Sequence, residues 1–132
     1  MDFAKAATDL RSPTFLVREL AAAELARAGV DGALALAQVA LDARCDESVR
    51  VTAVRHFAAA HGDDLCDALR ILLGDPSPAI RLWAIAKVAD AKLVSLVDLV
   101  TKLTTDETVV WDLDEERSVA KAATEALARL GK

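Results

Sequence analysis

Apolar residues recur along this chain at the spacing of an α-helix. Ile80, Ala84 and Val88 stand four residues apart, which places their side chains on one face of a helix. Ser77 fits the N-cap of this helix, and Pro78 fits its first turn, where a missing backbone N–H costs nothing. The pattern therefore predicts a helix that begins near Pro78.

The same template occurs four times along the chain. Its copies are Val17-Arg18-x-x-Ala21-x-x-x-Leu25, Val49-Arg50-x-x-Ala53-x-x-x-Phe57, Ile80-Arg81-x-x-Ala84-x-x-x-Val88 and Val119-Ala120-x-x-Ala123-x-x-x-Leu127. The first residues of successive copies are 32, 31 and 39 positions apart. Because a period of this size is typical of helical repeats, we expect a single domain of four repeats, at about 1–29, 30–62, 63–91 and 92–132.

Each repeat is expected to hold an outer and an inner helix joined by a short turn. The predicted helices cover residues 2–10, 13–28, 33–43, 46–60, 63–73, 93–103 and 115–130, together with one that begins at 78. Short turns make the two helices antiparallel, and such hairpins in tandem stack into an α-solenoid. The segment Thr108-Val109-Val110-Trp111 is β-prone, but it is short and lies among acids, so we expect an all-α fold.

The repeated segments resemble HEAT repeats, especially the short HEAT-like repeats of phycobilin lyases. The resemblance is carried by Asp46, Val49-Arg50, Ala53 and Phe57, and by Asp75, Ile80-Arg81, Ala84 and Val88. In that family the arginine commonly pairs with an acid near the turn between helices, which forms a ladder along the stack. The resemblance implies this structural role for Arg18, Arg50 and Arg81, with Asp46 and Asp75 as candidate partners. The fourth copy departs from the pattern, because Ala120 replaces the arginine.

Composition agrees with helices that pack closely. The chain is 54% apolar but only 4% aromatic, so Ala, Leu and Val must fill the core. No apolar run approaches the roughly 20 residues that a membrane span needs, and the first residues lack the order of a signal peptide. With two cysteines, Cys45 and Cys66, the sequence predicts a reduced, cytoplasmic protein without membrane partners.

The net charge of −5 comes from one segment. Between Lys102 and Arg117 there are six acids and no base: Asp106, Glu107, Asp112, Asp114, Glu115 and Glu116. We expect a solvated acidic turn that caps the last helix. The spacing Asp112-x-Asp114-x-Glu116 also suggests calcium ligands, but the glycine and the terminal bidentate Glu of an EF-hand loop are missing.

The inner helices should also present a face to solvent. At 100° per residue, the side opposite the buried stripe carries positions two, six and ten after the first buried residue of each copy. From these positions and the adjoining Trp83 we select a candidate patch for binding a protein on the concave face: Val51, Arg55, Leu82, Trp83 and Arg27. An apolar centre with Trp and Arg is typical of a binding hot spot. Packing between repeats explains the same apolar residues, and this alternative stays open.

Other candidate chemistry is weaker. His56 and His61 are five positions apart, which is not the spacing of two metal ligands on one helix face, and His61 with Cys66 forms no recognised zinc pattern. Neither cysteine is accompanied by a histidine or an acid in a catalytic order. We therefore expect no catalytic residue, no metal and no cofactor.

Three classes of function fit these observations. The first is a non-catalytic adaptor that binds another protein, which the repeats and the candidate patch favour. The second is an enzyme or chromophore-binding protein like the lyase-type HEAT-like proteins. The third is nucleic-acid binding, which we disfavour because Glu19, Asp90 and Glu125 alternate with the basic residues of the exposed face. The partner and the oligomeric state stay open.

Overall fold

The computed structural model describes residues 2–112 and 114–132, and over these residues the chain is mostly helical. In chain order the elements are α1 (Phe3–Asp9), α2 (Phe15–Ala26), α3 (Gly29–Ala40), α4 (Glu47–Arg55), the 3-10 helix η1 (Ala59–His61), α5 (Gly62–Leu72), α6 (Pro78–Asp90), η2 (Val94–Leu96), α7 (Val97–Lys102), η3 (Leu103–Thr105), β1 (Val109–Asp112), β2 (Glu115–Ser118) and α8 (Val119–Arg129). The predicted predominance of helix is confirmed, and the strand pair is an addition to it.

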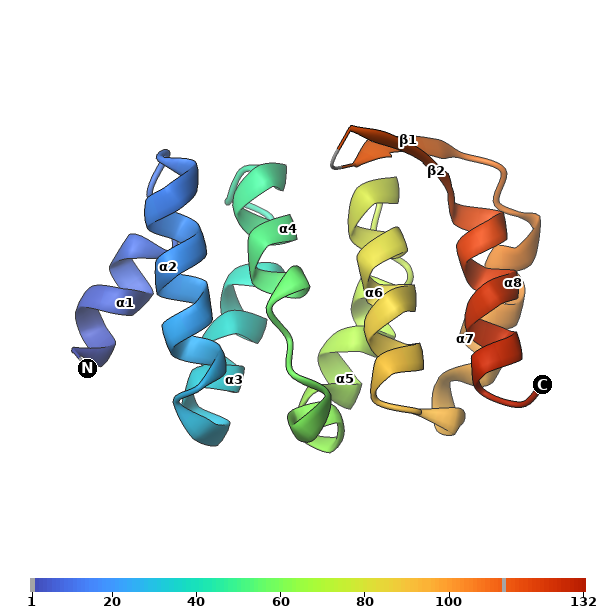
Figure 1. The fold of residues 1–132 in the computed structure, drawn as a ribbon, viewed down its shortest axis with the longest axis horizontal. Coiled ribbons are helices and arrows are strands. Elements are labelled where there is room, and N and C mark those ends of the chain that lie inside the picture. Colours follow the sequence, from blue (N-terminus) through green and yellow to red (C-terminus); the bar gives the residue numbers. More distant parts are fainter. Residues whose placement is uncertain (1, 113) are drawn as a thin grey trace.

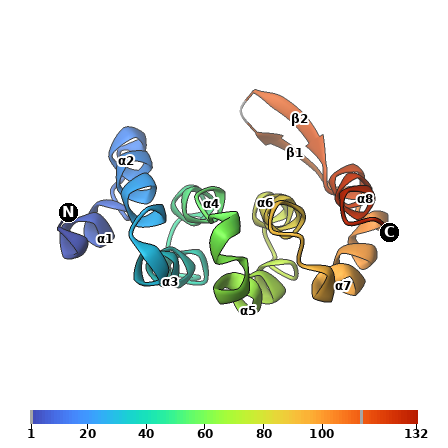
Figure 2. The same cartoon turned by 60° about the horizontal axis from the view of Figure 1, so that its bottom comes forward.

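The helices lie in two layers along the length of the molecule (Figure 1). In the first layer α2, α4, α6 and α8 stand side by side, and α3, α5 and α7 form the second layer (Figure 2). Each helix of the second layer contacts the helix that follows it in the first. The short helix α1 packs against α2 at one end. The helices that the sequence pairs are therefore neighbours in space.

Small apolar residues let the two layers approach closely. Ala21, Ala53, Ala84 and Ala123, at the same position of the four copies, are all buried. Leucines of the second layer, including Leu36 and Leu72, fill the space opposite and are fully buried. Interiors filled in this way reach the density of organic crystals, so the core gives the fold a fixed geometry on which surface residues are held.

The first copy departs from the prediction at its start. Val49, Ile80 and Val119 are buried as expected, but Val17 is 36% exposed and Leu20 is 60% exposed. The helix that carries them, α2, is the first of its layer, and in the described part of the chain only the short helix α1 flanks that side. The prediction that Val17 is buried is therefore wrong, because the described residues place no first-layer helix over this side of α2.

Residues 29–32, which lie between the predicted helices 13–28 and 33–43, belong to α3, which begins at Gly29. Gly29 has a φ of 74°, a conformation that glycine adopts without steric cost, so the chain reverses within very few residues. Gly32 then lies against α2, where a Cβ atom would stand 1.9 Å from the Leu25 carbonyl oxygen. The two glycines allow α2 and α3 to follow each other with almost no connecting loop.

Two other predicted helices are shorter than expected. The helix α4 ends at Arg55 rather than at residue 60, because Ala58 is extended, with φ −89° and ψ 137°. Phe57, which the prediction placed inside this helix, is nevertheless buried. Between residues 93 and 103, where one helix was predicted, η2 precedes a shorter α7.

The predicted last helix begins at Val119 rather than at residue 115. Glu115–Ser118 instead forms β2, which pairs antiparallel with β1, so that Val109 faces Ser118 and Trp111 faces Glu116. The prediction of a fold without strands is thus wrong for this segment. The hairpin contacts α6 and the start of α8, and this tertiary support decides the conformation of a short β-prone segment.

Candidate functional site

A side-chain oxygen closes a turn before each helix of the first layer. Ser12, Asp42, Asp75 and Asp106 accept a hydrogen bond from the backbone N–H two residues later, at 3.1, 3.0, 2.9 and 3.1 Å. These residues are 30, 33 and 31 positions apart. The spacing of 39 residues that breaks the sequence period therefore comes from the hairpin inserted after Asp106.

Two of the predicted ladder arginines reach the turn acid of the following copy. Arg50 forms an ion pair with Asp75, and Arg81 Nε donates to Asp106 Oδ2 at 3.0 Å. Burial alone would raise the pKa of Asp106, but hydrogen bonds from Thr108 and the charge of Arg81 outweigh it and hold the pKa below its ordinary value. These pairs tie consecutive copies together.

The first copy has no such pair among its described contacts. Arg18 donates instead to the carbonyls of Ser12 and Pro13, at 3.1 and 3.0 Å. The predicted partner Asp46 is exposed at the N-cap of α4, so its assignment to the ladder is wrong. Sequence analysis also missed Asp106 as a partner, although its place 31 residues after Asp75 is the signal that could have found it.

Three side chains of the first layer form a partly buried network between α2 and α4. Glu19 forms an ion pair with Arg55, and its carboxylate lies 2.7 Å from His56 Nε2. Burial lowers the pKa of His56, and the charges of Arg55 and Lys87 lower it further, so we assign a neutral ring that donates its Nε2–H to Glu19. The network fixes Arg55 at the centre of the layer.

Trp83 lies between two arginines and beneath the hairpin. The guanidinium carbons of Arg55 and Arg117 stand 6.0 and 5.8 Å from the centroid of its ring, within the range of cation–π attraction. Its indole Nε1–H donates to Asp112 Oδ1 at 3.2 Å, and Arg117 lies 3.6 Å from the other Asp112 oxygen. Trp83 therefore anchors the hairpin to α6.

The outward side of strand β1 carries two exposed apolar side chains. Along β1 the side chains alternate, with Val110 and Asp112 partly buried and Val109 and Trp111 exposed. Trp111 is 74% exposed and Val109 is 48% exposed. The hairpin thus holds Trp111 in solvent. The hydrogen bond between Trp83 and Asp112 attaches the hairpin to α6.

The structure changes the predicted patch. Leu82 is 1% exposed, so its assignment to a partner-binding surface is wrong. The prediction assumed that α6 buries a single face, but α6 packs against α4, α5, α8 and β1. Val51 is partly buried against the core, and Arg55 and Trp83 are held by contacts within the chain. Arg27 is exposed at the end of α2. Packing, the open alternative, accounts for most of the patch.

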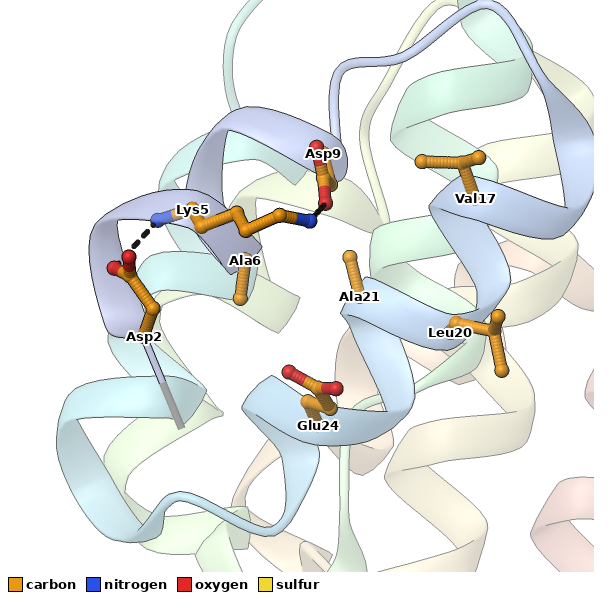
Figure 3. Close-up of a pocket in the computed structure, with 8 residues that line it drawn as sticks. All are labelled: Asp2, Lys5, Ala6, Asp9, Val17, Leu20, Ala21 and Glu24. Carbon is orange, nitrogen blue, oxygen red and sulfur yellow. Dashed lines mark hydrogen bonds and ion pairs between the residues drawn. The ribbon is translucent and has the colours of Figure 1, made fainter.

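A pocket of about 370 Å³ lies at the other end of the molecule, between α1 and α2. Figure 3 shows its lining, with Val17, Leu20 and Ala21 of α2 opposite α1 and the carboxylates of Asp2, Asp9 and Glu24 around them. The Lys5 ammonium group pairs with Asp9 at 2.6 Å. The sites predicted from the sequence do not include this pocket, because the pattern predicts Val17 to lie in the core.

The described residues contain no group of three or more His, Cys, Asp or Glu side chains that could hold a metal ion. Arg11 Nη1 lies 2.8 Å from the Cys45 sulfur, yet burial raises the pKa of this thiol, which disfavours the reactive thiolate. Among the described residues, no helix combines the length and apolar character needed to cross a membrane.

No protein-family model matches the chain, and no curated protein shows significant similarity to it.

Proposed function

We propose that this chain is a HEAT-like α-solenoid that binds another protein and catalyses no reaction of its own. The two layers of helices and the recurrence of one turn at nearly constant spacing support the solenoid, since tandem hairpins stack in this way. Arg50 and Arg81, each directed to the turn acid of the next copy, support the HEAT-like assignment.

The observation that carries the binding proposal is the exposure of Trp111. An aromatic ring of this size loses much of its contact with water when a partner covers it. Tryptophans near the centre of a protein interface are among the residues that contribute most to the binding energy. Trp111 and Val109 share the outward face of β1, and the anchored hairpin orders this face before binding, which lowers the entropic cost of association.

The charges around the hairpin indicate the chemistry of the partner. Glu116 faces Trp111 across the strands, and the exposed Asp114 and Glu115 adjoin it. A protein that offers an apolar pocket rimmed by Lys or Arg complements this surface. The same acids repel phosphate groups, which is why we propose a protein rather than a nucleic acid.

Affinity capture from a cell extract tests the proposal. The wild-type chain is expected to retain a protein that the Trp111→Ala variant loses, with capture reduced about tenfold or more. Ile71→Ala serves as a matched control, because Ile71 is also a large exposed apolar residue, at 61%, on the second layer. If the captured proteins are unchanged in Trp111→Ala while its circular-dichroism melt matches the wild type, the proposed surface is wrong.

A further inference from the structure

Helix α2 exposes an apolar side at the end of the molecule. Leu16, Val17 and Leu20 are 63%, 36% and 60% exposed, and Val17 and Leu20 line the pocket shared with α1 (Figure 3). One turn of exposed apolar residues is common on a protein surface. A side that carries several of them and borders a pocket is typical of a docking surface.

The rest of the chain shows what covers the equivalent side elsewhere. Val17 corresponds to Val49, Ile80 and Val119, which are 6%, 0% and 0% exposed. Each of these lies on a helix that contacts the preceding helix of the first layer: α4 contacts α2, α6 contacts α4, and α8 contacts α6. A helix laid beside α2 would therefore occupy the place that α2 itself occupies beside α4.

Polar contacts show the register of such a pair of helices. Leu20 and Glu24 correspond to Thr52 and His56 in the next copy. In the α2–α4 pair, Arg18 Nε lies 3.5 Å from Thr52 Oγ1 and Glu19 lies 2.7 Å from His56. The earlier helix thus places an acid opposite the base of the later one.

At the exposed side of α2 a carboxylate takes the place of the imidazole. Glu24 stands where His56 stands in α4, and Asp2 and Asp9 line the same pocket. Lys5, which lines the same pocket, already pairs with Asp9. In the α2–α4 pair, Glu19 of α2 faces His56 of α4. A helix that docks beside α2 as α2 lies beside α4 therefore needs a positive charge at the position equivalent to Glu19, where it faces Glu24. Face-to-face pairing of two copies would instead bring these acids together.

We propose that the side of α2 lined by Val17, Leu20 and Glu24 docks an amphipathic helix of another protein, with small or branched apolar residues on its inner face and Lys or Arg beside Glu24. This is the helix-in-groove mode of recognition, read as anchors three and four residues apart. The surface is separate from the hairpin around Trp111, and either proposal can fail without the other.

Selection from a phage-displayed library of amphipathic helical peptides of about 15 residues tests this inference. We expect enrichment of peptides with apolar residues at helical spacing and a flanking Lys or Arg. Leu20→Asp should weaken binding of the enriched peptides about tenfold or more. Glu24→Lys should shift the preference toward peptides with Asp or Glu, an outcome that a purely structural role of Glu24 would not produce.

Two control variants define the site. Leu34→Asp, at a 51% exposed leucine of α3, and Trp111→Ala should both bind the enriched peptides as the wild type does. The inference is overturned if no peptide is enriched, if Leu20→Asp binds as tightly as the wild type, or if Glu24→Lys leaves the charge preference unchanged. It is also overturned if sedimentation shows a dimer that Leu20→Asp converts to a monomer, because the occupant is then a second copy.

Discussion

At the scale of single residues, Asp75 serves two parts of the chain at once. Its carboxylate accepts the backbone N–H of Ser77 at 2.9 Å and pairs with Arg50 from the preceding copy. The first contact closes a turn and the second joins two copies. Because a charge-assisted hydrogen bond contributes more than a neutral one, one aspartate fixes both the local conformation and the relative position of neighbouring helices.

Asp106 makes the stability of the protein sensitive to acid. Its pKa is lower in the folded chain than the ordinary value of 3.8, so the unfolded state binds the proton more tightly. The stabilisation is complete well above pH 3.8 and is lost as the pH falls through the folded pKa. We predict that Asp106→Asn lowers the free energy of unfolding by about 1–2 kcal/mol at pH 7 and flattens its decline below pH 4.

Urea unfolding between pH 3 and pH 7 measures this effect, and Asp98→Asn, at an exposed aspartate of α7, is the control. The control should follow the wild-type pH dependence. A decline in Asp106→Asn as steep as that of the wild type would show that the pair with Arg81 does not stabilise the fold.

Gly32 is required by the close approach of α2 and α3. Because an added Cβ would lie 1.9 Å from the backbone oxygen of Leu25, Gly32→Ala should force the helices apart and cost about 1–3 kcal/mol. Gly74→Ala is the matched control, since the nearest atom to its added Cβ would be 3.6 Å away, and its effect should stay within about 0.5 kcal/mol. Equal denaturation midpoints for the two variants would contradict this explanation.

At the scale of elements, the hairpin depends on α6 rather than on its own sequence. An isolated two-stranded hairpin is marginally stable in water, and β1 and β2 pair over only four residues each. The contact between Trp83 and Asp112 supplies the missing support. Sequence patterning could not anticipate this, because Asp112 lies 29 residues from Trp83 and reads as one of six acids in a solvated turn.

We predict that Asp112→Ala loosens the hairpin while the helices stay folded. The change leaves the Trp83 indole N–H without its acceptor and removes the acid near Arg117, at a cost of about 1–3 kcal/mol. Amide hydrogen exchange of residues 109–118 should become faster, and that of α6 should not. Glu115→Ala, at an exposed position of the same hairpin, should leave exchange unchanged, and acceleration throughout α6 would contradict a local role for Asp112.

At the scale of the whole molecule, α6 packs against several other elements. It touches α4, α5, α8 and β1, so its side chains are buried on more than one side. Leu82 shows the consequence, because it lies opposite the predicted buried stripe and is nevertheless buried. A surface assignment from one helix in isolation fails in the middle of a row of helices, where neighbours cover both flanks.

Leu82→Ala should therefore lower the stability of the fold. Removal of a fully buried leucine side chain costs about 2–5 kcal/mol, which is a large part of the stability of a domain this size. Ile71→Ala, at an exposed position of α5, is the control and should change the free energy of unfolding little. Guanidinium unfolding curves give both values, and a Leu82→Ala curve that coincides with the wild type would contradict its burial.

The sequence by itself determined the helical class, the order in which neighbouring helices pack and, for α6, the residues that start the helix. The helix α6 begins at Pro78 with Ser77 accepting from the Ile80 N–H, as the pattern predicts. These features follow from interactions within a few residues of the chain, which periodicity and capping express directly.

Only the tertiary structure decided which apolar residues stay exposed. Val17 and Ile80 occupy the same position of the template, yet the first is exposed and the second buried. The helix of Ile80 has a preceding first-layer helix beside it, α4, and within the described residues the helix of Val17 has none. Trp111 belongs to a β-prone segment that becomes a strand once α6 supports it. The burial of a side chain and the attachment of the hairpin to α6 both depend on contacts between residues far apart in the sequence. Both proposed binding surfaces consist of apolar side chains that such contacts leave exposed.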